Sequence, residues 1–332
     1  MRIGIIGQGL AGTALAWQSH WAGHDVAIFD RGLKESASWV AAGLINPLVL
    51  RRKRLIKDAS EHLAHMQSFY RRVEGEIGTT LFYPGPIHEI LSDAQAEEDW
   101  KDLRLQREFE SFLGQPQSLC HPRILGKSQA SVVGSKRLRV PHYLMESRGF
   151  FKRHHSLEEV EVQSIERIED GGLILNSTWK LDALLIAEGY PGKWTEKFFG
   201  ALPFSPSRGE GLRVTWEGEE IPYALHENIF LLPDGDGSYQ AGSTYSWDAL
   251  SGPPSESAKE ELLEKLRSWF DQPVEVLDQW HGIRPNMSDR QPRWAWHPSL
   301  ERLGFLNGLG SRGALTSPWL SEKLLAGLKT SS

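Results

Sequence analysis

Cysteine is nearly absent from the sequence, because Cys120 is the only one in 332 residues. An internal disulfide is therefore excluded, and this usage fits a reducing compartment. No helix start or glycine-rich turn surrounds Cys120, so we interpret it as an inert thiol. The sequence also lacks a charge-free apolar run of about 18 residues and a small-residue cleavage site. These absences predict a cytoplasmic protein that has no membrane segment.

An excess of positive charge is missing as well. The formal net charge is −6 and the pI is about 6.1, which gives no global attraction to nucleic acid or to an anionic membrane. The only basic run is R-R-K-R at 51–54. We interpret it as a solvated loop, with an RNA or phosphate contact as the alternative. Hydrophobic residues make up 40% of the chain and charged residues 24%, as in ordinary globular proteins with a full core.

The amino-terminal segment alternates between strand and helix patterns. Residues 2–6 are a short apolar run, residues 10–21 have apolar helical faces, and residues 25–29 form a second apolar run. The first run leads directly into G-Q-G-L-A-G at 7–12. A glycine pattern of this kind within a strand–helix–strand unit predicts a dinucleotide-binding turn.

Each glycine of this turn has a separate physical task. Gly7 permits the tight turn, Gly9 lets the backbone approach a pyrophosphate, and Gly12 lets helix and strand pack closely. The free N–H groups and the positive dipole end of the helix would face the phosphates. Asp30, at the end of the second strand, would accept hydrogen bonds from ribose hydroxyls and repel a 2′-phosphate. NADP is therefore disfavoured, whereas NAD and FAD remain equally compatible with the turn.

A run of small residues follows soon after, in S-W-V-A-A-G-L-I-N-P at 38–47. A buried strand would not favour Ala41, Ala42 and Gly43 in succession, and a helix would not favour the glycine. We interpret the run as backbone against which a flat, bulky group lies. A tight structural turn is the alternative.

Further elements can be predicted from periodicity and from turn residues. The last segment indicates a strand, a glycine loop and a helix that starts near Ser317 and Pro318, as N-cap and first helical residue. The other predicted helices are 58–77, 94–112 and 257–270, and the other predicted strands are 173–175, 183–186, 211–216 and 228–233.

Eight segments between residues 3 and 318 follow one another along the chain: GIIGQGLAG, SASWVAAGLINPL, RVPHYL, ALLIAEG, SPSRGE, FLLPDGDGSYQAGST, GIRP and GLGSRGALTSP. Taken in this order, they resemble the FAD-dependent D-amino-acid oxidase (DAO) superfamily, its glycine-oxidase-like and sarcosine-oxidase-like members above all. They also resemble the C-terminal FAD oxidase module of the bifunctional enzyme that processes carboxymethylaminomethyl-uridine in tRNA.

The resemblance implies a mixed α/β fold, in which a Rossmann-like FAD-binding domain is interleaved with a smaller antiparallel-sheet substrate domain. The FAD-binding domain would comprise residues 1–80, 128–203 and 282–332, and the substrate domain residues 81–127 and 204–281. FAD would be bound non-covalently, and no metal site is predicted. The implied FAD-contacting residues are Gly7, Gly9, Leu10, Ala11, Gly12, Asp30, Arg31, Ser38, Ala41, Ala42, Gly43, Leu44, Gly189, Gly310, Ser311, Arg312, Gly313, Ala314, Leu315 and Thr316.

The resemblance also implies an active site that oxidises the C–N bond of a small amino acid or an N-substituted glycine. Arg284 would pair with the substrate carboxylate, and Arg312 would lie beside the active site. Tyr245, Trp247 and Phe230 would line an aromatic pocket, in which Tyr245 could also hydrogen-bond the carboxylate. The alternative to these roles is a structural salt bridge for Arg284 and ordinary core packing for the aromatic residues.

Three features depart from the family pattern. Charged and bulky residues at 289–294 replace an Asp-Gly-x-Pro stretch, Glu188 replaces a small or hydroxyl residue, and the chain is short for the superfamily. The alternatives left open are a modified uridine in tRNA as substrate, an NAD-dependent dehydrogenase, and a non-catalytic FAD-binding protein. Nucleic acid is thus a possible but disfavoured partner, and the sequence does not predict the oligomeric state.

Overall fold

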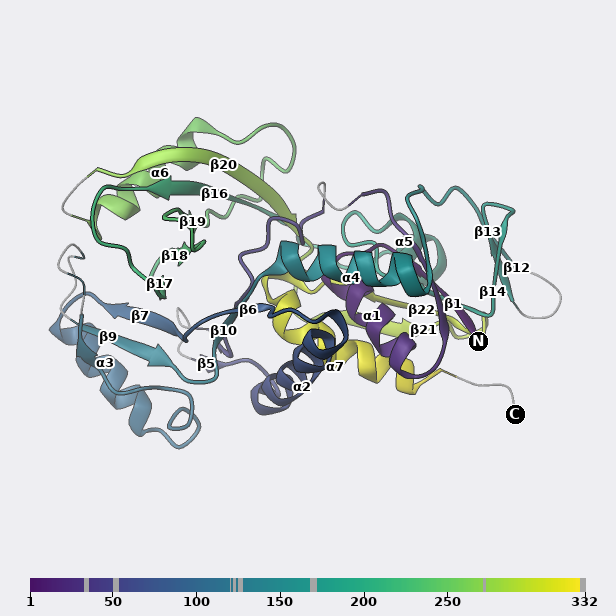
Figure 1. Ribbon diagram of the computed structural model, residues 1–332, viewed down its shortest axis with the longest axis horizontal. Helices are drawn as coiled ribbons and strands as arrows, with labels where there is room; N and C mark the ends of the chain where they lie inside the picture. The colour runs from purple at the N-terminus through teal and green to yellow at the C-terminus, as the bar shows by residue number, and fades with distance from the viewer. Residues whose placement is uncertain are drawn as a thin grey trace.

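The structure is a computed structural model that describes residues 1–32, 36–49, 54–119, 121, 124, 128–167, 172–270 and 273–328. Cys120 and residues 51–53 of the basic run lie outside the described residues. Figure 1 shows an elongated molecule with one large sheet in each half, and both chain termini lie at the same end. No helix in the described part of the chain is long and apolar enough to cross a membrane.

The half that contains the termini is built on a six-stranded sheet in the order β11-β2-β1-β15-β22-β21. All neighbouring strands run parallel except the edge pair β21·β22. The strands are β1 (Arg2–Ile6), β2 (Asp25–Phe29), β11 (Ser156–Glu158), β15 (Ala183–Ile186), β21 (Arg293–Trp296) and β22 (Leu303–Asn307). The predicted strands at 2–6, 25–29 and 183–186 are confirmed.

Both faces of this sheet are covered, which explains why its strands are continuous apolar runs. Alternate residues point to opposite faces: Ile5 contributes to the core beneath the helices, whereas Ile6 contributes to the core on the other side. The helices on the first face are α1 (Leu10–Trp21), α2 (Ala59–Ile77), α4 (Val140–His154) and α7 (Gly313–Ala326). The other face is covered by α5 (Lys193–Phe199) and by the sheet of β12 (Ile165–Arg167), β13 (Leu173–Leu175) and β14 (Trp179–Leu181).

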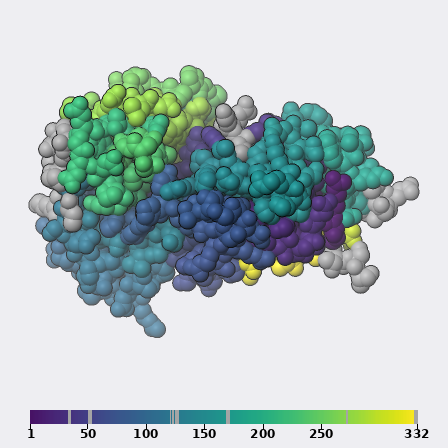
Figure 2. Space-filling model, viewed as in Figure 1, coloured from purple at the N-terminus to yellow at the C-terminus, as the bar shows by residue number. Residues whose placement is uncertain are grey.

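The other half contains an eight-stranded sheet in the order β20-β16-β19-β18-β17-β7-β9-β8. Its strands are β7 (Ile87–Leu91), β8 (Gln117–Ser118), β9 (Ser128–Val132), β16 (Ser207–Thr215), β17 (Ala224–His226), β18 (Phe230–Pro233), β19 (Tyr239–Gly242) and β20 (Glu275–Arg284). The mixed α/β fold is confirmed, with one correction: β17 and β7 pair in parallel, so this sheet is not purely antiparallel. Figure 2 shows the blue and green segments of this half at the end of the molecule away from the termini.

The strand pairing bears on the predicted domain boundaries. β9 pairs with β7 in the eight-stranded sheet, although residues 128–132 were expected in the first domain. β20 likewise continues to Arg284, beyond the predicted boundary at residue 281. We therefore propose boundaries near residues 133 and 285, which keep both strands within the sheet that they complete.

Short strands connect the two halves. β10 (Lys136–Leu138) lies between β3 (Leu44–Ile45) and β6 (Phe82–Tyr83), and β4 (Leu48–Val49) pairs with β5 (Arg54–Leu55). These pairings fix the segment that follows the small residues at 41–43.

Two predicted helices are shorter than expected. α3 (Ala94–Leu105) ends seven residues before the predicted 112, because Gln106 is extended and the chain then turns to bury Phe109 beside Trp100. α6 (Glu256–Arg267) ends before the predicted 270, and its N-cap Ser255 accepts a hydrogen bond from the amide of Ala258 at 3.2 Å. For α3, tertiary burial rather than the helical pattern determines the end.

The last helix begins earlier than predicted. α7 starts at Gly313, so Pro318 lies inside the helix and Ser317 is not its N-cap. Proline has no amide N–H to donate to the carbonyl four residues earlier, here that of Ala314. The hydroxyl of Tyr70, on α2, donates to this carbonyl at 2.9 Å and replaces the missing bond.

Candidate active site

A cavity of about 2540 Å³ lies between the two sheets. It is much larger than the roughly 300–1,000 Å³ of a typical small-ligand pocket. Gly7, Ala187 and Asn307, at or just beyond the carboxyl ends of β1, β15 and β22, line one side. The carboxyl edge of a parallel sheet is where such folds bind ligands. The eight-stranded sheet provides the opposite wall.

The first turn has the geometry of an anion site. Gly7 has φ +92°, and a Cβ on Gly12 would lie 1.8 Å from the carbonyl oxygen of Gly7. Gly12 is therefore needed for close packing of helix on strand, as predicted. Among the described residues, no side chain caps Gly9 and no acidic residue occurs in the first turn of α1. The amides of this turn other than that of Leu10 are available to a phosphate. Ser38 stands beside them and accepts a hydrogen bond from the amide of Leu10 at 3.1 Å.

Asp30 lies next to this turn and is held by the backbone. Its carboxylate accepts hydrogen bonds from the amides of Gln8 at 2.7 Å and Gly32 at 2.8 Å. Arg148, on α4, approaches Asp30 at 3.6 Å and donates to the side-chain oxygen of Gln8. A carboxylate has about four acceptor positions, so Asp30 retains capacity for ribose hydroxyls. Sequence reasoning missed Arg148, because nothing near residue 148 indicates a contact with residue 30.

The small residues at 41–43 have two separate structural explanations. Ala41 and Ala42 line the cavity, as expected for backbone beneath a flat group. Gly43 has φ +73°, and a Cβ there would lie 1.9 Å from the carbonyl oxygen of Leu138. The amide of Leu138 in turn donates to the carbonyl of Gly43 at 2.8 Å. Close approach to β10 therefore explains this glycine, in agreement with the structural-turn alternative.

The start of α7 also lines the cavity, next to the start of α1. Gly308 and Gly310 adopt positive φ angles of +77° and +57°, and a 3₁₀ turn at 310–312 leads into the helix. A Cβ on Gly313 would lie 2.9 Å from the side chain of Leu10, so the starts of α7 and α1 pack together. Of the predicted FAD-contacting residues, all but two line the cavity. The exceptions are Gly12, packed on Gly7, and Leu315, buried in the core.

Arg284, at the end of β20, lies on the cavity wall that the eight-stranded sheet provides. Its guanidinium donates to the Ser243 hydroxyl at 2.5 Å and to the Thr244 carbonyl at 3.3 Å, and it stacks 4.0 Å from the ring centroid of Tyr245. A Cβ on Gly209 would lie 2.1 Å from this guanidinium. Only a glycine on β16 allows the side chain to cross from β20 to Tyr245.

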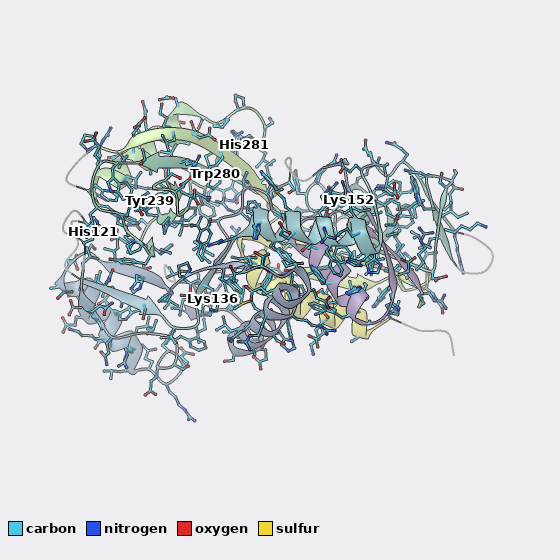
Figure 3. All side chains as sticks on the ribbon, viewed as in Figure 1. His121, Lys136, Lys152, Tyr239, Trp280 and His281 are labelled. Atoms are coloured by element: carbon cyan, nitrogen blue, oxygen red, sulfur yellow. The ribbon has the colours of Figure 1, made fainter. Side chains whose placement is uncertain are left out.

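The same relation recurs along this wall. A Cβ on Gly211 would lie 2.1 Å from the ring of Trp280, and one on Gly242 would lie 2.9 Å from the ring of Phe230. Figure 3 shows Trp280 below β20, on the side toward the β7–β17 part of the sheet. Trp280 and Phe230 both line the cavity. Glycines therefore let large side chains lie flat on the sheet and leave the cavity open.

Neither predicted arginine has an acidic partner in the described part of the chain. Within the described residues, no carboxylate lies within ion-pair distance of Arg284 or Arg312. The structural salt bridge considered for Arg284 is therefore not observed. Burial lowers the pKa of both guanidinium groups, although arginine remains protonated in proteins. Both line the cavity, and the exposed Arg54 contributes a further positive charge near Arg312. The cavity thus offers positive charge to an anionic ligand.

Glu188 has a structural task that its sequence position did not indicate. Its carboxylate accepts hydrogen bonds from the Thr195 amide at 2.7 Å and the Thr195 hydroxyl at 3.1 Å, in the first turn of α5. Burial raises the pKa of Glu188, while these hydrogen bonds and the nearby Arg31 lower it. Glu188 therefore caps α5 from the edge of the cavity.

Two ion pairs of the eight-stranded sheet, one half-buried and one buried, were also missed. His226 contacts Glu89 at 2.8 Å across the parallel β17·β7 pair, and both line the cavity. Burial raises the pKa of Glu89, and Glu89 in turn raises the pKa of His226. Arg208 contacts Glu210 at 3.0 Å on the other face of β16. The His226·Glu89 pair joins strands that are distant in sequence, so no local pattern could indicate it, whereas Arg208 and Glu210 lie two residues apart on one strand.

The fold and the cavity define a dinucleotide-binding protein with a second, substrate-facing sheet. The family model for DAO, described as "FAD dependent oxidoreductase", matches residues 2–327 of the chain. The chain is 24% identical to a glycine oxidase of Bacillus licheniformis, over 96% of this chain and 90% of that protein.

Two solved structures share the fold. The glycine oxidase of Geobacillus kaustophilus has a TM-score of 0.80 and 21% identity, with 100% of this chain and 96% of that chain covered. The iminodiacetate oxidase of Chelativorans sp. BNC1 has a TM-score of 0.79 and 18% identity, with 100% and 97% covered. The chain belongs to the DAO family of FAD-dependent oxidoreductases. FAD, rather than NAD, is thus its dinucleotide, and the protein is an enzyme.

Proposed function

We propose that this enzyme oxidises the C–N bond of a small amino acid or an N-substituted glycine, whose carboxylate is bound by Arg284. The observation that carries the proposal is the position of Arg284: half-buried, facing the cavity, and without a carboxylate partner among the described residues. Its fork of N–H groups suits a carboxylate, and its three hydrogen bonds leave donors free. The names of the relatives, glycine oxidase and iminodiacetate oxidase, agree with this substrate class.

The residues on the opposite wall fit FAD. The uncapped start of α1, with Ser38 beside it, would hold the pyrophosphate, and Asp30 would hold the ribose. The backbone at Ala41 and Ala42 leaves room for the flavin ring, and the start of α7 offers positive dipole to its rim. When bound, FAD supplies the hydride acceptor. Arg284 and Tyr245 then have only to hold and orient the substrate, because positioning provides most of what such chemistry needs from the protein.

The test is anaerobic reduction of the purified holoenzyme. We expect glycine, sarcosine or iminodiacetate to bleach the flavin absorption and to yield glyoxylate, whereas ethylamine, which lacks a carboxylate, leaves it unchanged. Bleaching by ethylamine at the same rate would remove Arg284 from its proposed role. A flavin that none of the carboxylated amines reduces would contradict the proposed reaction.

A further inference from the structure

The exposed apolar side chains are not distributed at random. Eight large hydrophobic side chains are exposed in the described part of the chain. The four aliphatic ones, Leu105, Val133, Met145 and Leu277, lie outside the cavity, whereas the four aromatic ones all line it. These aromatic residues are Tyr190, Tyr245, Trp247 and Trp294. Exposed aromatic surface gathered at one opening indicates a binding site.

Tyr245 and Trp247 form a pair on the substrate side of this opening. Their side chains are 52% and 51% exposed, and their rings are stacked with centroids 6.2 Å apart and planes 27° apart. The guanidinium of Arg284 lies over the Tyr245 ring, 4.0 Å from its centroid. The aromatic pair therefore begins where the proposed carboxylate site ends.

Backbone pairing fixes the direction of the Tyr245 ring. Ser246 exchanges two hydrogen bonds with Arg208 on β16, at 2.8 and 3.0 Å. Because neighbouring residues of extended chain point to opposite faces, Tyr245 lies on the face opposite to Ser246, and the Trp247 ring is stacked with it. This is the face on which Arg284 crosses Gly209.

The segment after Trp247 is clamped from the opposite face. The guanidinium of Arg208 donates to the carbonyls of Ser251 at 2.8 Å and Gly252 at 3.0 Å. The carboxylate of Glu210 accepts from the amide of Ser255 at 2.7 Å. The aromatic pair is therefore pre-organised, which lowers the entropic cost of binding a ligand against it.

We propose that Tyr245 and Trp247 bind a planar aromatic substituent on the amine nitrogen of an N-substituted glycine. This inference rests on the proposed function, because it takes Arg284 as the carboxylate site. Glycine or sarcosine held by Arg284 has no group that would cover a second exposed ring. A flat substituent would bury Trp247 and stack on it, and aromatic stacking adds to the affinity gained from the buried area.

Two ether analogues that carry no oxidisable amine test the inference in the holoenzyme. Methoxyacetate has the shape of sarcosine, and benzyloxyacetate has the shape of N-benzylglycine. We expect benzyloxyacetate to bind at least about tenfold more tightly, measured by calorimetry and by the change in flavin absorption. Equal dissociation constants would overturn the inference and leave the proposed function intact. If neither analogue binds, the carboxylate site itself fails, and the inference fails with it.

A matched pair of variants locates the effect. Trp247→Ala should weaken benzyloxyacetate binding about tenfold and change methoxyacetate binding less than twofold, while Trp247→Phe should restore most of the lost affinity. The control is Leu277→Ala, which removes an equally exposed apolar side chain on β20 outside the cavity and should change neither constant. An equal loss for both analogues in Trp247→Ala would assign the tryptophan a merely structural role and overturn the inference.

Discussion

The two walls of the cavity use glycine for opposite purposes. On the dinucleotide side, Gly9 leaves backbone amides uncovered, so the missing side chain makes room for a ligand. On the substrate side, Gly209 and Gly211 lie beneath Arg284 and Trp280, so the missing side chain makes room for the protein's own residues. We therefore expect the first wall to bind phosphate mainly through backbone amides and the second wall to bind substrate through side chains. A glycine motif in the sequence therefore predicts the exposed amides of the first wall, whereas the glycines of the second wall do not indicate which side chains lie over them.

The largest effect is expected on the dinucleotide side. In Gly9→Val the new side chain would cover the amides at the start of α1, since even a Cβ there lies 2.8 Å from the Ser38 hydroxyl. Gly9 has φ −74°, which valine tolerates, so we expect a folded protein that purifies without flavin. The ratio of flavin to protein absorption measures the flavin content, and far-UV circular dichroism shows whether the protein is folded. A yellow Gly9→Val protein would contradict the phosphate assignment.

Gly75→Ala is the matched control for that variant. Gly75 lies inside α2, and a Cβ there meets no atom within 4 Å. We expect normal flavin content and an increase of about 0.5–1 kcal/mol in the free energy of unfolding, because alanine favours helix.

The next effect is expected on the substrate side. Arg284→Leu removes the proposed carboxylate partner and leaves the dinucleotide wall intact. We expect KM for a carboxylated amine to rise about 100-fold, as loss of a charged hydrogen-bonded contact of about 3 kcal/mol would give. Flavin content should stay normal. Unchanged steady-state kinetics would show that substrate does not contact Arg284.

A smaller effect should come from the glycine beneath this arginine. In Gly209→Ala the added Cβ would lie 2.1 Å from the guanidinium, whose flexible stem can move away. We expect KM to rise about tenfold while the melting temperature and flavin content stay near those of the wild type. A large loss of stability with unchanged KM would mean that Gly209 serves the sheet rather than the position of Arg284.

The smallest effect concerns the cap at Glu188. Glu188→Ala should lower the free energy of unfolding by about 1 kcal/mol, the usual cost of losing a helix cap. Burial raises the pKa of Glu188 on folding, so its contribution is greatest below the unfolded pKa and is lost as pH rises through the folded pKa. Glu188→Gln keeps an acceptor oxygen without the charge. We therefore expect it to match the wild type near pH 4 and to be the more stable protein at pH 7, in chemical denaturation.

The sequence predicted the dinucleotide side far better than the substrate side, for a physical reason. The strand, turn and helix up to Trp21 form a contiguous unit, and α1 has the predicted bounds Leu10–Trp21. Arg148 beside Asp30 and the His226·Glu89 pair arise only when distant strands and helices pack. The early start of α7 was missed for the same reason, because a tyrosine on another helix compensates for Pro318.

That hydroxyl of Tyr70 has a consequence for how the molecule is assembled. The last helix cannot satisfy the carbonyl of Ala314 by itself, so its opening turn depends on a residue 244 positions earlier in the chain. The end of the cavity that would receive the developing negative charge of the reduced ring is thus completed by long-range docking and not by local coiling. If α7 formed before α2 packed against it, the binding site for the coenzyme would still be incomplete.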